Sequence, residues 1–163
     1  MSSPLANASV NCGRDLDRSG ELPHVLQFMQ ALWAVVHGLD RASKRMAQQL
    51  GITGPQRLVL RVVGLFPGVS AGDLAAVLHI HPSTLTGVLR RLAAQGLIVR
   101  LCDPQDRRRA LLRLTARGDQ ANGTRQGTIE EAVAVVLAKV SGRERLATTQ
   151  LLQRLTLRLP GKL

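Results

Sequence analysis

The stretch from Ser70 to Arg100, SAGDLAAVLHIHPSTLTGVLRRLAAQGLIVR, decides the fold. Ser70 and Asp73 have the form of a capping box, and a short helix with one apolar face follows them. His79-Ile80-His81 is long enough only for a turn. Pro82 suits the first turn of a second helix, which Gly96 ends. Two helices joined by a tight turn form a helix-turn-helix, whose second helix can enter a DNA major groove.

The outward face of the second helix carries side chains that suit DNA contact. Leucine and valine recur at helical spacing and predict the buried side: Leu85, Val88, Leu89 and Leu92. The opposite side and its flanks carry small polar residues and arginines, without an acid: Ser83, Thr84, Thr86, Gly87, Arg90 and Arg91. Hydroxyl groups and glycine allow close approach to base edges, and arginine binds guanine or phosphate. An ordinary solvated amphipathic helix is the alternative explanation of this pattern.

The composition favours a duplex nucleic acid as partner. The chain has 163 residues, which is enough for one domain with a sizeable core. Lysine and arginine number 22 against 11 acids, giving a net charge of +11, and such an excess attracts polyanions. Aromatic residues make up only 2%. Because single-stranded nucleic acids are usually bound by aromatic stacking, this scarcity favours a double-stranded partner.

The cysteine content and the start of the chain predict a cytoplasmic protein. Cys12 and Cys102 do not make a disulfide framework, which fits a reducing compartment. Residues 1–20 lack the basic and apolar regions of a secretory signal and predict a flexible arm. The most apolar runs of the chain are too short to span a bilayer.

Long helices on both sides of the helix-turn-helix predict a dimer. A helix from about Leu22 to Leu50 keeps one apolar face over roughly seven turns. The last helix begins at a capping box, Ser141 with Glu144, and carries leucine on more than one face. Such helices suit packing against a second subunit. We therefore expect a helical dimerisation region at 21–52 and 116–163 and a DNA-binding domain at 53–115.

Two further helices complete the predicted domain. Thr53-Gly54-Pro55-Gln56 has the form of a helix start. The expected buried face of this helix consists of Leu58, Val59, Val62, Val63 and Phe66. Thr115 is expected to begin a helix whose apolar positions extend to Val140, with a bend near Asn122, Gly123 and Gly127.

After Gly96 the hydrophobic period changes from helical to alternating. Residues 97–102 and 110–114 alternate and predict a β-hairpin, because the segment between them is turn-prone. From Arg90 to Arg117 the chain carries eight arginines against Asp103 and Asp106, a local excess of six positive charges. A charged loop is usually only solvated. Here it follows a candidate recognition helix, so we expect a wing that touches phosphates and the minor groove.

These residues together resemble the winged helix-turn-helix of the MarR family of bacterial transcription regulators. The wing signature D-P-x-D-R-R stands at Asp103 to Arg108, and Leu114-Thr115 ends the following strand. The resemblance extends from about Leu22 to Leu159. It implies a mainly α fold with a small β-hairpin wing (α+β), and an obligate homodimer with interlocked first and last helices. Such a dimer presents two recognition helices to a pseudo-palindromic operator.

The resemblance also implies roles by position. Ser83, Thr84, Thr86, Gly87 and Arg90 match the DNA-binding face of the recognition helix, with Arg91 on its flank. Arg108 matches the wing arginine that enters the minor groove, and Asp106 matches the acid that braces it; we assign Arg107 and Arg109 to phosphates. A small aromatic or phenolic effector is implied as well, and the candidate residues for its pocket are Trp33, His37, Arg41 and Arg61.

Other chemistries are less well supported. His79 stands where the family commonly has glycine and is expected in the left-handed region with slight strain. His79 and His81 lack a nearby Cys or Glu ligand, so we expect turn and capping roles and no metal. Cys102, in a strand, is expected to be a small buried side chain and not a redox sensor. Neither a catalytic motif nor a phosphate-binding loop is present, so we expect neither an enzyme nor a bound cofactor.

The sequence therefore predicts a homodimeric, sequence-specific DNA-binding regulator, a repressor released by a small effector. Two alternatives stay open. One is an architectural protein that binds DNA with little sequence preference. The other is a protein-interaction module that uses the winged-helix fold without DNA.

Overall fold

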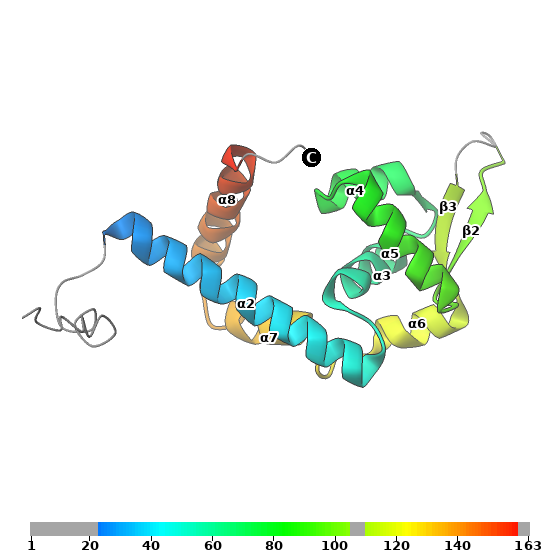
Figure 1. Cartoon of the computed structure of the whole chain (residues 1–163), viewed down its shortest axis with the longest axis horizontal. Coiled ribbons are helices and arrows are strands. Elements are labelled where there is room, and N and C mark those ends of the chain that lie inside the picture. Colours follow the sequence, from blue (N-terminus) through cyan, green and yellow to red (C-terminus); the bar gives the residue numbers. More distant parts are fainter. Residues whose placement is uncertain (1–22, 105–109, 160–163) are drawn as a thin grey trace, which may run out of the picture. The chain divides into compact units, whose positions relative to one another are not determined.

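The structure, a computed structural model, describes residues 23–104 and 110–159 (Figure 1). Its elements are α2 (His24–Leu50), α3 (Gly54–Leu65), β1 (Val69–Ser70), α4 (Ala71–Leu78), α5 (Pro82–Ala94), β2 (Ile98–Cys102), β3 (Ala110–Leu114), α6 (Ala116–Gly123), α7 (Ile129–Leu137) and α8 (Gly142–Arg158). The predicted mainly helical fold with a small hairpin is confirmed. The chain divides into two units, one that ends at His37 and one that begins at Gly38. Among the described helices, none combines the length and the apolar character needed to cross a membrane.

Side-chain caps fix where several helices begin. The Thr53 hydroxyl accepts from the Gln56 main chain at 3.4 Å, and the Gln56 side chain accepts from the Thr53 main chain at 2.8 Å. Ser141 and Glu144 make the same reciprocal pair at 3.2 and 2.8 Å. The helix start predicted at Thr53 and the capping box predicted at Ser141 are therefore confirmed. Ser70 caps α4, and its hydroxyl also donates to the Asp73 carboxylate at 2.6 Å.

The segment after Thr115 forms two helices, so the prediction of one bent helix is wrong. Thr115 caps α6, where its hydroxyl accepts from Gly118 at 3.0 Å. Thr128 caps α7, where its hydroxyl accepts from Glu131 at 3.3 Å. Gly127 between them has φ 74°, a value outside the helical region. A second N-cap and weak helix formers between the two caps produce a break in place of a bend.

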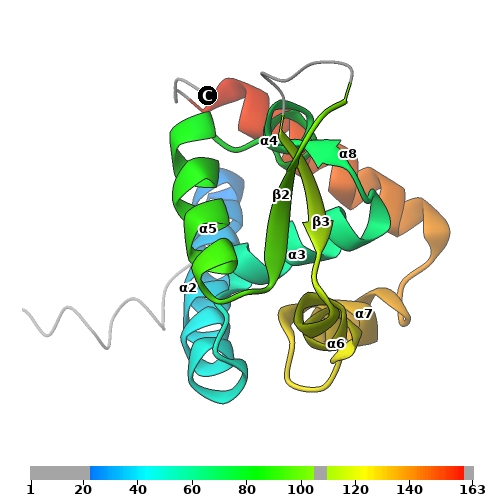
Figure 2. The ribbon, with the colours of Figure 1, turned by 90° about the vertical axis from the view of Figure 1, so that its right-hand side faces the viewer.

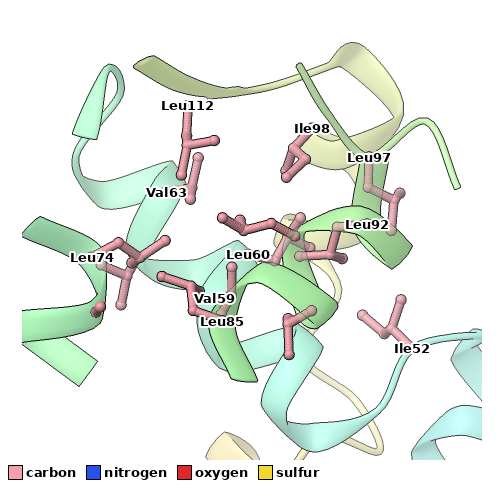
Figure 3. Close-up of a cluster of buried hydrophobic side chains, with 14 residues drawn as sticks. Ile52, Val59, Leu60, Val63, Leu74, Leu85, Leu92, Leu97, Ile98 and Leu112 are labelled. Carbon is pink, nitrogen blue, oxygen red and sulfur yellow. The ribbon is translucent and has the colours of Figure 1, made fainter. Parts of the chain in front are cut away.

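One hydrophobic core holds the helix-turn-helix and the sheet together. Figure 3 shows Leu60 of α3 among Val59, Val63, Leu85 and Leu92. The core is completed from α4 and the sheet, and its buried members are Ile52, Val59, Leu60, Val62, Val63, Leu74, Ala75, Leu85, Val88, Leu89, Leu92, Leu97, Ile98 and Leu112.

The predicted buried face of α3 needs a correction. Leu58 is 50% exposed and Phe66 58% exposed, whereas Leu60 is fully buried. Phe66 is the C-cap of α3, with φ −127° and ψ 73°, so its side chain leaves the helical face. Leu60 and Leu58 lie about 100° from Val59 in opposite directions, so the buried face of α3 is rotated toward Leu60 and away from Leu58.

The sheet has three antiparallel strands in the order β1-β3-β2. Ile98 pairs with Leu114 at the base of the hairpin and Cys102 with Ala110 at its far end, while Val69 pairs with Leu112. The two-residue strand β1 is too short to show alternation in a sequence. Beside the base of the hairpin, a Cβ added to Gly118 of α6 would lie 2.0 Å from the Leu97 carbonyl oxygen. Only glycine allows this close approach of the α6 backbone to the residue that precedes β2.

Candidate nucleic-acid interface

The outward face of α5 is the centre of the candidate interface. Ser83, Thr84, Thr86, Arg90 and Arg91 are exposed, and Gly87 is half-buried. The opposite face packs into the core through the four predicted residues Leu85, Val88, Leu89 and Leu92. The predicted orientation of the helix is therefore confirmed. A side chain added at Gly87 would meet no protein atom within 4 Å, so the middle of this face is open.

The two turn histidines set the start of α5. His79 is the C-cap of α4, with φ 51° and ψ 42°. His81 is the N-cap of α5, and its imidazole Nδ1 accepts from the Ser83 main-chain N–H at 3.2 Å. The Ser83 hydroxyl lies 2.7 Å from the same nitrogen. The left-handed conformation of His79 and the capping role of this pair are confirmed.

The end of α5 is held from two sides. The Gln95 side chain donates through Nε2 to the Gly51 carbonyl at 3.0 Å. Arg117 of α6 donates through Nη1 to the Gln95 carbonyl at 3.0 Å, and the Thr115 hydroxyl donates to the Gly96 carbonyl. These contacts satisfy carbonyl groups that lack partners at a helix end. These hydrogen bonds fix the position of the C-terminal end of α5 against Gly51 and the start of α6.

The hairpin lies beside α5 and adds positive charge, with α3 behind both (Figure 2). Arg100 of β2 and Arg113 of β3 are exposed. The predicted wing residues Asp106, Arg107, Arg108 and Arg109 lie outside the described residues. Asp103 is the only acid among the described residues of β2, β3 and the adjoining wing. Arg100 pairs with Leu112 and Arg113 with Val99, so the two arginines lie on opposite faces of the hairpin. The exposed arginines of α5 and of the hairpin suit a polyanion.

A buried arginine links the winged helix to the following helices. Arg57 of α3 is 2% exposed, and its Nε donates to the Glu130 carboxylate of α7 at 2.8 Å. Its terminal nitrogens donate to the carbonyl groups of Ala121, Asn122 and Thr124, with 3.1 Å to Asn122 and 2.6 Å to Thr124. One guanidinium thus caps the C-terminus of α6 and binds the first turn of α7.

The surroundings of Glu130 shift the pKa of its carboxyl group. Partial burial acts to raise the pKa of Glu130. Its own main-chain N–H, the hydrogen bond and charge of Arg57, and the charge of Arg61 act in the other direction, and the net result is a pKa below the ordinary value. Glu130 is therefore ionised at neutral pH and balances the buried charge of Arg57. We call Arg57, Arg61 and Glu130 the arginine clasp.

The predicted effector residues have distinct surroundings. Trp33 and His37 stack on each other one turn apart on α2, with ring centroids 6.2 Å apart, and Arg41 is exposed. Arg61 belongs to the clasp, because its Nη1 donates to the Asn122 carbonyl and side-chain oxygens at 3.3 and 3.0 Å. An effector role for these four residues stays a prediction.

A cavity of about 350 Å³ lies elsewhere, where the end of α2, the end of α5 and α6 meet. Its lining combines an apolar floor with a few polar groups: Leu50, Gly51, Ile52, Gln95, Leu97, Arg117, Gln120, Ala121 and Thr124. The Gln95 Oε1 atom is buried and has no hydrogen-bond partner among the described residues. No local sequence pattern indicates this cavity, because its residues come from three separate segments of the chain.

Two other sequence predictions concern metal and cysteine chemistry. Among the described residues, no group of three or more His, Cys, Asp or Glu side chains has the arrangement of a metal site. Cys102 is exposed, so the expectation of a buried side chain is wrong. Its face of β2 is covered at Ile98, near the base of the hairpin, and becomes exposed toward the far end.

Known proteins with a related sequence are regulators of transcription. A family model described as the MarR family matches residues 50–109. The chain is 30% identical over 123 residues to the HTH-type transcriptional regulator TtmR of Methylorubrum extorquens, an alignment that covers 76% of this chain and 61% of TtmR. It is also 30% identical over 102 residues to the homoprotocatechuate degradative operon repressor of Escherichia coli, covering 63% of this chain and 69% of the repressor. The chain thus spans less than two thirds of the length of TtmR.

A solved structure gives a related fold. The transcriptional regulator PcaV from Streptomyces coelicolor, solved in complex with its natural ligand, matches with a TM-score of 0.65 and 25% sequence identity. The match covers 86% of this chain and 99% of that chain. Correspondence over this length includes the helices that flank the winged helix as well as the winged helix itself.

Proposed function

Because this chain belongs to the MarR family, we propose that it is a sequence-specific regulator that binds double-stranded DNA and represses transcription. One observation carries the proposal. The outward face of α5 is exposed, free of acids and open at Gly87, and it stands beside further exposed arginines of the hairpin. Such a face suits close approach to base edges, while the arginines suit phosphates. Chromosomal DNA as target implies action in the cytoplasm.

Each part of the surface has an assigned task. Ser83, Thr84, Thr86 and Gly87 approach the bases in the major groove. Arg90 reads a base or binds phosphate, and Arg91 binds phosphate. In the wing, Arg108 enters the minor groove with Asp106 as its brace, and Arg107 and Arg109 bind phosphates. These contacts make the affinity strongly dependent on salt.

A homodimer supports this mode of binding. Exposed apolar side chains recur on α7 and α8, among them Val133, Val136, Leu146, Leu151 and Leu152, and the same holds for α2 at Leu26, Met29, Trp33 and Val36. Contiguous exposed apolar surface marks a protein interface. Two copies joined through these helices place two copies of α5 about one DNA turn, ~34 Å, apart on a pseudo-palindromic operator.

The proposed release signal is a small aromatic or phenolic acid. The relative from Escherichia coli is named for a degradative operon, and PcaV was solved with its natural ligand. The cavity at the end of α5 supports a second location for such a molecule besides the predicted residues on α2 and α3. Arg117 suits a carboxylate, and the unpartnered Gln95 Oε1 suits a hydroxyl donor. A ligand there acts only if it binds one dimer arrangement more tightly than the other.

Selection of bound sites from a random duplex pool tests the proposal. A regulator of this kind enriches a palindrome with two half-sites about one helical turn apart. Enrichment of no sequence supports the architectural alternative, which the net charge of +11 also favours. Absence of duplex binding at low salt supports the protein-interaction module.

Gly87→Ala gives a sharper test of the α5 face. The added methyl meets no protein atom and raises helix propensity, so we expect the free protein to gain roughly 0.5–1 kcal/mol of stability. The same methyl obstructs the approach to DNA, so we expect operator affinity to fall about tenfold, or ~1.4 kcal/mol. Gly123→Ala is the matched control, because its Cβ also meets nothing within 4 Å but lies in α6. Unchanged operator affinity in Gly87→Ala contradicts the assigned face.

A further inference from the structure

The hydroxyl groups at the start of α5 have defined hydrogen-bond directions. The Ser83 main-chain N–H donates to His81 Nδ1 at 3.2 Å. Because a main-chain N–H can only donate, Nδ1 carries no proton, and the ring proton of the neutral imidazole is on Nε2. The Ser83 hydroxyl lies 2.7 Å from this same Nδ1 and is therefore the donor in that contact.

Thr86 is constrained in a similar way. Its hydroxyl donates to the Pro82 carbonyl at 2.8 Å, one turn back along the helix. The hydroxyl protons of Ser83 and Thr86 are thus both used inside the protein. The oxygen atoms of Ser83 and Thr86 remain exposed toward the proposed DNA with lone pairs to offer.

We propose that His81 is a positioning residue that makes Ser83 a hydrogen-bond acceptor toward DNA, so that the start of α5 selects an exocyclic amino group in the major groove. This inference rests on the proposed function. The major groove presents two such donors, the N4 amine of cytosine and the N6 amine of adenine. Guanine O6 and thymine O4 accept hydrogen bonds and offer nothing to an oxygen without a proton. Ser83 thereby distinguishes cytosine and adenine from guanine and thymine, although a serine hydroxyl can in general either donate or accept a hydrogen bond.

The test combines base analogues with two variants. In the selected operator, each cytosine is replaced in turn by 2-pyrimidinone and each adenine by purine, which removes one exocyclic amine at a time. At about pH 7.5 we expect one replacement in each half-site to weaken wild-type binding roughly fivefold and to leave Ser83→Ala unaffected. Comparison with Ser83→Ala removes the effect of the analogue on the duplex itself.

The second variant, His81→Ala, tests the positioning role directly. It removes the nitrogen that accepts the Ser83 hydroxyl proton and keeps Ser83, so we expect the amine preference to fall toward onefold. Ratios between matched duplexes cancel any general change in affinity. Circular dichroism establishes that both variants fold, and the Ser83→Ala comparison stands even if His81→Ala does not fold.

The outcomes separate this inference from the function on which it rests. Equal binding to all duplexes overturns both. A defined operator without an amine effect that depends on Ser83 overturns the inference alone. A contact from Ser83 to guanine O6 or thymine O4 at about pH 7.5 does so too, and so does an amine preference in His81→Ala equal to that of the wild type.

Discussion

The winged helix differs from α7 and α8 in the burial of its apolar side chains. In the winged helix, α3, α4, α5, the sheet and the loop residues Ile52 and Leu97 bury fourteen hydrophobic residues in one cluster. In α7 and α8, the described residues include no buried side chain, although valine and leucine are frequent in both helices. The hydrophobic core of the winged helix is formed by residues of one chain. In α7 and α8, most apolar side chains are exposed.

This difference separates two kinds of stability. Burial within the chain stabilises the winged helix at any protein concentration. Apolar faces on α7 and α8 gain the same stabilisation only when another surface covers them, so their stability depends on protein concentration. Between the two regions lies the arginine clasp, which joins α3 to the end of α6 and the start of α7.

The largest effect is expected from removal of residues 141–163, which include α8. We expect the dimer to be lost while the winged helix stays folded, because none of the core residues belongs to α8. A monomer binds one half-site, so operator affinity should fall by a factor of about 10²–10⁴ through the loss of bivalency. Sedimentation velocity and operator titration measure both effects. A truncated chain that still sediments as a dimer would place the interface elsewhere.

Leu60→Ala tests the other side of the comparison. Leu60 is fully buried, so we expect the free energy of unfolding to fall by roughly 2–5 kcal/mol at every protein concentration. Leu151→Ala is the matched control, because Leu151 of α8 is 51% exposed. Its effect should appear as weaker dimerisation. Urea denaturation at two protein concentrations distinguishes them, and a loss in Leu151→Ala that is independent of concentration contradicts the distinction.

The clasp should respond to acid. The pKa of Glu130 is lower in the folded chain than its ordinary value, so its ionised form stabilises the fold above the unfolded-state pKa, near 4.5. That contribution is lost as the pH falls through the lower, folded-state pKa. Glu130→Gln should cost about 1 kcal/mol at neutral pH, because the contact is charge-assisted but Glu130 is 40% exposed.

Denaturation at about pH 7 and about pH 3 measures this dependence, and the difference between wild type and Glu130→Gln should shrink in acid. Asp40→Asn is the control. Its pair with Lys44 has the same 2.8 Å separation as Arg57 with Glu130, but both of its side chains are more than half exposed. We expect little effect there at either pH. Equal losses in the two variants would show that burial of Arg57 adds nothing.

The smallest effect is expected at His79. Glycine adopts φ 51° without strain, but it also has a more disordered unfolded state. His79→Gly should therefore raise the free energy of unfolding by no more than about 1 kcal/mol, and thermal unfolding measures it. His79→Val should lower stability, since a β-branched residue is unfavourable in this region. A lower free energy of unfolding in His79→Gly would mean that the imidazole stabilises the fold by more than the backbone strain at His79 destabilises it.

Local patterns predicted the features that depend on neighbouring residues. The spacing of Leu85, Val88, Leu89 and Leu92 gave the orientation of α5, and Thr53 and Ser141 gave two helix starts. The role of Arg57 was missed because its partners are main-chain carbonyl groups more than 60 residues away, which no side-chain pattern displays. The predicted buried face of α3 also placed Arg57 on the side away from the core, because the burial of Leu60, three positions further on, was not predicted.

The contact between Gly118 and Leu97 restricts which amino acids this fold accepts at position 118. A Cβ at position 118 would overlap a main-chain oxygen, and a backbone atom cannot move aside as a flexible side chain can. In a library that samples every amino acid at each position, we expect 118 to accept glycine alone, whereas Gly38 and Gly123, with open space around them, accept alanine. Amino-acid variation is thus more restricted at position 118, where α6 meets the residue before β2, than at positions 38 and 123.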